Sequence, residues 1–81
     1  MEKELMIKST AGLHAMLASK IVRAASKYEV EIDLVYKDKT VDAKSILGLM
    51  SLAVPSGENV RLVATGEKAD LAIKDIEKLL G

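Results

Sequence analysis

Four segments of the chain alternate apolar and polar residues with a period of two, which is typical of a β-strand that buries one face. We predict strands over 3–8, 28–36, 40–42 and 59–65. Apolar residues recur instead at helical spacing over about 15–26 and over 69–80. In the first of these segments the predicted apolar stripe consists of Ala15, Ala18, Ile21, Val22 and Ala25. Strands with one apolar face and helices with one apolar stripe pack as two layers. The patterns therefore predict an open-faced α+β sandwich in the order β-α-β-β-α-β-α, with the helices on one face of a single sheet.

The segment 45–53 is too apolar for its periodicity to separate a short helix from a buried strand. A helix is favoured because Ser45 is a common N-cap and residues 55–57 supply a stop. Such a short helix cannot bury all of its apolar residues, which are Ile46, Leu47, Leu49, Met50 and Leu52. Most apolar residues on a helix belong to the core, but some of these must stay exposed. An exposed apolar patch is typical of a docking surface for partner proteins, and methionine suits a surface that meets several of them.

Composition excludes several classes of function. The formal net charge is zero, from 12 basic and 12 acidic residues, so we expect neither nucleic acid nor an anionic membrane as a partner. Without cysteine and with one histidine, we expect no disulfide, no metal site and no cofactor. Residues 1–81 contain no apolar run of transmembrane length and no signal-peptide pattern. The expectation is a single cytoplasmic domain that is not inserted in a membrane.

His14, the only histidine, is the residue best suited to carry chemistry. Small, turn-prone residues precede it at 9–12, and the helical pattern starts at or just after it. The first N–H groups of a helix have no partner within it and, together with the helix dipole, favour an anion. A histidine in this place is suited to hold or pass on a phosphoryl group. The alternative is a plain surface residue or a weak cap.

Two separated motifs resemble the histidine-containing phosphocarrier proteins of the HPr family, which belong to the bacterial sugar phosphotransferase system. The first is Gly12-Leu13-His14-Ala15, followed by Ala18 and by Ala25-Ser26-Lys27, and the second is VDAKSILGLMSL at 41–52. The similarity extends from about Leu5 to Leu80. It implies an open-faced β-sandwich with a four-stranded antiparallel sheet. It also implies a carrier, not a turnover enzyme, that accepts a phosphoryl group from enzyme I on His14 and donates it to sugar-specific carriers.

The resemblance also implies roles beyond His14. Ser45 matches the position that a regulatory kinase phosphorylates in Gram-positive members, so HPr kinase and a catabolite control regulator are further expected partners. The resemblance implies that partner proteins dock on the short helix through Ile46, Leu47 and Met50. We add Lys20 to this docking set. In the same interpretation, the backbone amides of Met16 and Leu17 hold the phosphate.

The chain departs from the family directly after its histidine. The family usually has Ala-Arg-Pro-Ala at this point, whereas this chain has Ala15-Met16-Leu17-Ala18. A guanidinium can hold phosphoryl oxygens through two hydrogen bonds, which a thioether cannot do. Losing such a charge partner in the transition state can cost orders of magnitude in rate. Leu17, by contrast, restores a backbone N–H that proline lacks.

Two functions of different classes stay open on this evidence. In the first, the chain is a phosphocarrier that works through His14, with transfer impaired by Met16. In the second, transfer is slow or lost and the chain is a regulatory module phosphorylated at Ser45, similar to the catabolite-repression relative Crh. A generic α+β binding domain for a metabolite or RNA is disfavoured by the neutral charge and by the presence of only two aromatic residues, both tyrosines.

Overall fold

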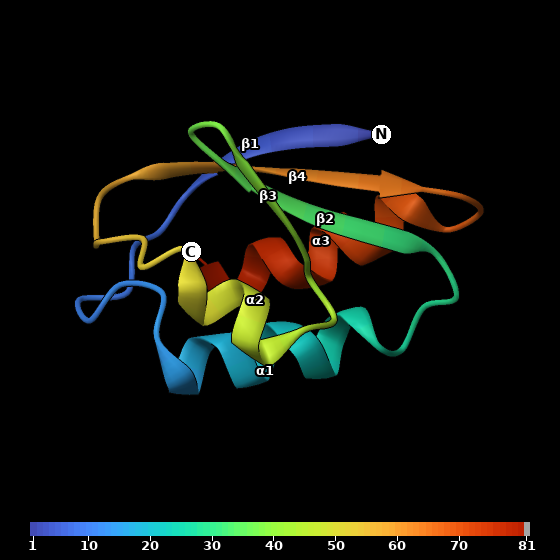
Figure 1. The fold of residues 1–81 in the computed structure, drawn as a ribbon. Helices are drawn as coiled ribbons and strands as arrows, with labels where there is room; N and C mark the ends of the chain where they lie inside the picture. Colours follow the sequence, from blue (N-terminus) through green and yellow to red (C-terminus); the bar gives the residue numbers. More distant parts are fainter. Residues whose placement is uncertain (81) are drawn as a thin grey trace.

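The predicted strands and helices are present in the computed structural model, which describes residues 1–80. Their order is β1 (Glu2–Met6), α1 (Ala15–Ala25), β2 (Glu31–Tyr36), β3 (Lys39–Asp42), α2 (Ile46–Ser51), β4 (Asn59–Thr65) and α3 (Ala69–Leu80). The strands form one antiparallel sheet in the order β1-β4-β2-β3, and the three helices lie together on one face of it (Figure 1). The predicted α+β open-faced β-sandwich with a four-stranded antiparallel sheet is therefore confirmed.

Strand alternation places the core between the sheet and the helices. In β4, Val60, Leu62 and Ala64 are buried, whereas Asn59, Arg61 and Thr65 on the other face are exposed. β2 follows the same rule with buried Ile32 and Leu34, and the helices contribute the matching apolar stripes. Burying a side chain of this size stabilises the fold by about 1.5–3 kcal/mol. None of the helices within residues 1–80 has the length and apolar character needed to cross a membrane.

The first two strands are shorter than their alternation predicts. β2 begins at Glu31 and not at Tyr28, because the chain leaves α1 through tight turns in which the Tyr28 N–H donates to the Ala25 carbonyl. β1 ends at Met6, because the next two N–H groups bond outside the β1–β4 ladder. Those of Ile7 and Lys8 donate to the carbonyls of Glu58 and Leu80.

The buried stripe of α1 is rotated from the predicted one. We expected Ala15 on the apolar face, but Ala15 is exposed, while Leu17 and Ala24 are buried. The stripe is centred on Ile21, and its members are Leu17, Ala18, Ile21, Ala24 and Ala25. Alanines occur on both sides of this helix, so its apolar pattern alone does not define the buried side.

A hydrogen bond between Tyr28 and Asp75 joins the turn that follows α1 to α3. The Tyr28 hydroxyl donates to the Asp75 carboxylate, and the Lys44 ammonium donates to the Tyr28 carbonyl at 2.8 Å. The hydrogen bond to Asp75 raises the pKa of Tyr28 above its ordinary value, and burial and the Asp75 charge add to the shift. The helix layer is thus held by polar contacts as well as by its core.

Candidate functional site

His14 lies at the N-cap of α1, at the helix start predicted from the sequence. Its backbone is extended, with φ −133° and ψ −165°, and its carbonyl accepts the Ala18 N–H at 2.8 Å. The side chain is exposed and caps no N–H group of the helix. The imidazole therefore keeps its nitrogens available to a ligand or a visiting protein.

The N–H groups that follow His14 point out of an open helix end. Within residues 1–80, no hydrogen bond joins the N–H of Ala15, Met16 or Leu17 to a protein acceptor. No acidic residue stands in the first turn, and none occurs between Glu4 and Glu29 in the sequence. The helix dipole and the free donors therefore favour an anion beside His14.

Met16 and Leu17 place their side chains in opposite surroundings. The Met16 side chain is 67% exposed, while Leu17 is buried in the core and contributes only its backbone to this surface. Met16 thus offers no charge at the position where the resemblance implies an arginine. Lys20, the next basic residue, is exposed, but the helical rise puts it about 9 Å further along the axis than His14.

Sequence reasoning missed the support beneath the histidine loop. The Leu13 N–H donates to the Val54 carbonyl at 2.8 Å, and the side chains of both residues are buried. These residues are far apart in sequence, so no local pattern pairs them. The one available signal was Gly12, since glycine is the residue that accepts a positive φ without strain, and its φ is +74°.

Ser45 caps α2 as predicted. Its side-chain oxygen accepts the Gly48 N–H at 3.1 Å, which satisfies one of the free donors at the start of this helix. Ser45 itself is half-buried.

The apolar residues of α2 divide between the core and the surface, as predicted. Leu49 and Leu52 are buried, whereas Ile46, Leu47 and Met50 are 42%, 81% and 41% exposed. We call these three the α2 patch. The helix that carries it packs against α1 beside the start of that helix (Figure 1).

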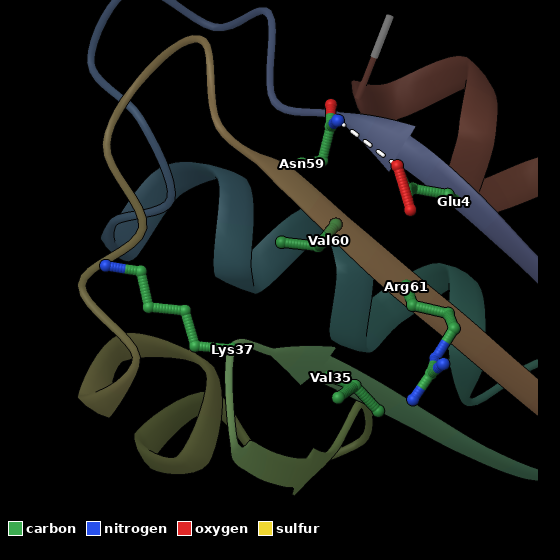
Figure 2. A pocket seen from close by; sticks show the side chains of 6 residues that line it. All are labelled: Glu4, Val35, Lys37, Asn59, Val60 and Arg61. Atoms are coloured by element: carbon green, nitrogen blue, oxygen red, sulfur yellow. Dashed lines mark hydrogen bonds between the residues drawn. The ribbon is translucent and has the colours of Figure 1, made fainter.

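A separate hollow of about 190 Å³ lies on the helix-free face of the sheet (Figure 2). It is lined by Glu4, Val35, Lys37, Asn59, Val60 and Arg61. The Asn59 amide donates to Glu4 at 3.2 Å, and Arg61 lies 3.7 Å from Glu2. This hollow contains none of the predicted site residues, and its polar groups partly satisfy one another. In the part of the chain that the structure describes, no three potential metal ligands come together.

Known proteins match both the sequence and the fold of this chain. The whole chain, residues 1–81, matches the family model described as PTS HPr component phosphorylation site. The HPr of Thermoanaerobacter tengcongensis is 41% identical, with a TM-score of 0.94 over 99% of this chain and 90% of that one. The HPr of Bacillus anthracis is 30% identical, with a TM-score of 0.95 over 100% and 96%.

A regulatory relative matches as well. The catabolite repression protein Crh of Bacillus subtilis is 35% identical, with a TM-score of 0.79 over 96% of this chain and 90% of that one. Both kinds of relative cover nearly all of this chain, and the family model spans it from end to end. The chain therefore belongs to the HPr family, whose members are phosphocarrier proteins and not turnover enzymes.

Proposed function

We propose that the chain carries a phosphoryl group on His14, which it accepts from enzyme I and passes to sugar-specific carriers. The observation that carries this proposal is the exposed His14 imidazole at a helix N-terminus whose first N–H groups have no protein acceptor within residues 1–80. Family membership supports enzyme I as the donor, since the HPr family implies partners of the phosphotransferase system.

The proposed step uses groups present at this site. A neutral imidazole nitrogen attacks the phosphorus atom of the donor, a new N–P bond forms, and the bond between phosphorus and the donor's leaving atom breaks. The electron pair of the broken bond stays with the donor. The transferred phosphoryl oxygens then face the N–H groups of Met16 and Leu17, which donate hydrogen bonds to them.

The α2 patch is the proposed docking surface for the donor and acceptor proteins. Its three side chains are apolar and exposed, and a partner would gain by removing them from water. Lys20, exposed on α1, is the proposed charged member of this surface.

Phosphorylation by enzyme I tests the carrier function. We expect incubation with enzyme I and phosphoenolpyruvate to add one phosphoryl group to the intact chain, and to add none to a His14→Gln variant. An authentic HPr serves as the positive control. An unchanged mass while that control is labelled would contradict the proposal.

A second function is favoured by Met16 and by the match to Crh. In this alternative, transfer through His14 is slow, and the chain acts as a regulatory module phosphorylated at Ser45 by HPr kinase and recognised by a catabolite control regulator. The Ser45 hydroxyl stands at the start of α2, where an added phosphate would meet free N–H groups. Labelling by HPr kinase that Ser45→Ala abolishes would support this function, and absence of labelling would contradict it.

A Met16→Arg variant separates the two functions. If the site has lost its carrier role through Met16, the arginine should raise the rate of phosphorylation by about 100-fold. This is the typical effect on rate of one hydrogen-bond donor that stabilises the transition state. If the carrier role is intact, the natural chain is already phosphorylated at a rate close to that of authentic HPr, and the arginine adds little. A Ser26→Arg variant, which adds the same charge at an exposed position beyond the far end of α1, is the matched control.

A further inference from the structure

Backbone hydrogen bonds before and after His14 hold the segment that carries its imidazole. The side chain itself caps no N–H of the helix. On the helical side, the His14 carbonyl accepts the Ala18 N–H. On the loop side, the Gly12 N–H donates to the Ser9 carbonyl at 3.0 Å, and the Leu13 N–H donates to the Val54 carbonyl at 2.8 Å. The contact with Val54 joins the histidine loop to the loop that follows α2.

Gly12 permits this contact because it has no side chain. A Cβ atom at this position would lie 2.6 Å from the Val54 carbonyl oxygen, 3.1 Å from the Ser56 nitrogen and 3.2 Å from the Pro55 Cα. All three are backbone atoms, so none can rotate out of the way as a flexible side chain would. The φ of Gly12, +74°, is also one that residues with side chains rarely adopt. Two independent constraints therefore require glycine here.

The loop that supports Gly12 is itself anchored. Val54 is buried in the core, and its loop is tied to the end of β1 by two hydrogen bonds between Ile7 and the residues 57 and 58. Gly57 donates to the Ile7 carbonyl at 2.8 Å, and Ile7 donates to the Glu58 carbonyl at 2.9 Å. The Val54 carbonyl is thus a fixed point against which the histidine loop rests.

We propose that Gly12, Leu13 and the Val54 carbonyl form a loop clamp that positions the His14 imidazole for phosphoryl transfer. They are positioning residues, because none of them touches the phosphoryl group. The reason is geometric, since a misplacement of the reacting atom by about 1 Å can cost roughly 100-fold in rate. The inference rests on the proposed carrier function and adds to it the residues that set the position and orientation of the nucleophile, the His14 imidazole.

A pair of glycine variants tests the loop clamp. Gly57 also has a positive φ, +90°, but a Cβ there meets no atom within 4 Å. Both Gly12→Ala and Gly57→Ala therefore place a side chain on a residue with positive φ. Only Gly12→Ala also forces the histidine loop away from the backbone of residues 54–56. With enzyme I as the phosphorylating enzyme, we expect Gly12→Ala to lower kcat about 100-fold with little change in KM, since the α2 patch is intact. Gly57→Ala should keep both constants near those of the natural chain.

A second pair of variants removes one hydrogen bond without adding any atoms. Total synthesis of the 81-residue chain allows the amide N–H of Leu13 to be replaced by an ester oxygen, which deletes the bond to Val54. The matched control is the same replacement at Ala43, whose N–H donates to the Ile32 carbonyl at 2.8 Å and takes no part in the histidine loop or the loop of Val54. We expect the Leu13 ester to lower kcat more than the Ala43 ester at equal folded fraction, measured by circular dichroism.

The outcomes separate this inference from the proposed function. If the natural chain is labelled but Gly12→Ala behaves like Gly57→Ala, or the two esters have equal kcat, the loop clamp is overturned and the carrier function stands. If Gly12→Ala does not fold, the ester pair decides. If the natural chain is not labelled at all, the proposed function and the loop clamp fail together.

Discussion

Replacing Ser45 by alanine removes the side-chain oxygen that accepts the Gly48 N–H at the start of α2. This helix has six residues, no acidic residue in its first turn and no basic residue in its last turn. The Ser45 cap therefore stabilises the start of this helix without help from a charged side chain, and its loss should cost about 1 kcal/mol. A chain of this length is stable by about 4–12 kcal/mol. One kcal/mol then lowers the melting temperature by about 4–8 °C.

Thermal unfolding with a matched control measures this loss. Ser51, at the other end of the same helix, is exposed, and its hydroxyl donates to the Gly48 carbonyl at 2.6 Å. We expect Ser51→Ala to change the free energy of unfolding by no more than about 0.5 kcal/mol. Ser45→Asp should recover the stability, because aspartate caps well and its charge favours the helix start. Equal melting temperatures for Ser45→Ala and Ser51→Ala would show that the Ser45 cap does not stabilise α2.

Two further variants probe the docking surface and the helix layer. Leu47→Ser should leave the free energy of unfolding within about 0.5 kcal/mol of the natural value, because the side chain is 81% exposed. It should raise the KM of enzyme I about tenfold, whereas Leu71→Ser on α3, 46% exposed, should not; equal KM values would contradict the docking role. The natural chain should lose stability as the pH rises through the raised pKa of Tyr28, because the protonated hydroxyl that donates to Asp75 is then lost. Urea unfolding across alkaline pH should show a smaller loss for Tyr28→Phe, and parallel curves would count against this hydrogen bond.

Local patterns predict the elements of this fold better than their arrangement. Alternation identified β4 over its full length, since Val60, Leu62 and Ala64 face the helices without interruption. It could not reveal that β1 pairs with β4 and not with its neighbour in sequence, because periodicity carries no information on strand partners. The same limit explains α1, where alanines on both sides left the buried side ambiguous.

The site was predictable where its geometry is local. The N-cap position of His14 and the Ser45 cap each depend on residues within one helical turn, and the sequence patterns predicted both. The exposure of the α2 patch followed from counting more apolar side chains than one face can bury. The contact between Leu13 and Val54 joins segments about forty residues apart in the chain, and only the folded backbone brings them together.

In the proposed function, a phosphoryl group on His14 is held by the N–H groups of Met16 and Leu17 at the start of α1. The most direct test is the ¹H–¹⁵N correlation spectrum of the ¹⁵N-labelled chain before and after phosphorylation by enzyme I. A new hydrogen bond to a charged phosphoryl oxygen should move the amide protons of Met16 and Leu17 downfield more than any others. Unmoved Met16 and Leu17 amides in a fully phosphorylated chain, or shifts centred on Ser45 and Gly48, would show that these N–H groups do not hold the phosphoryl group.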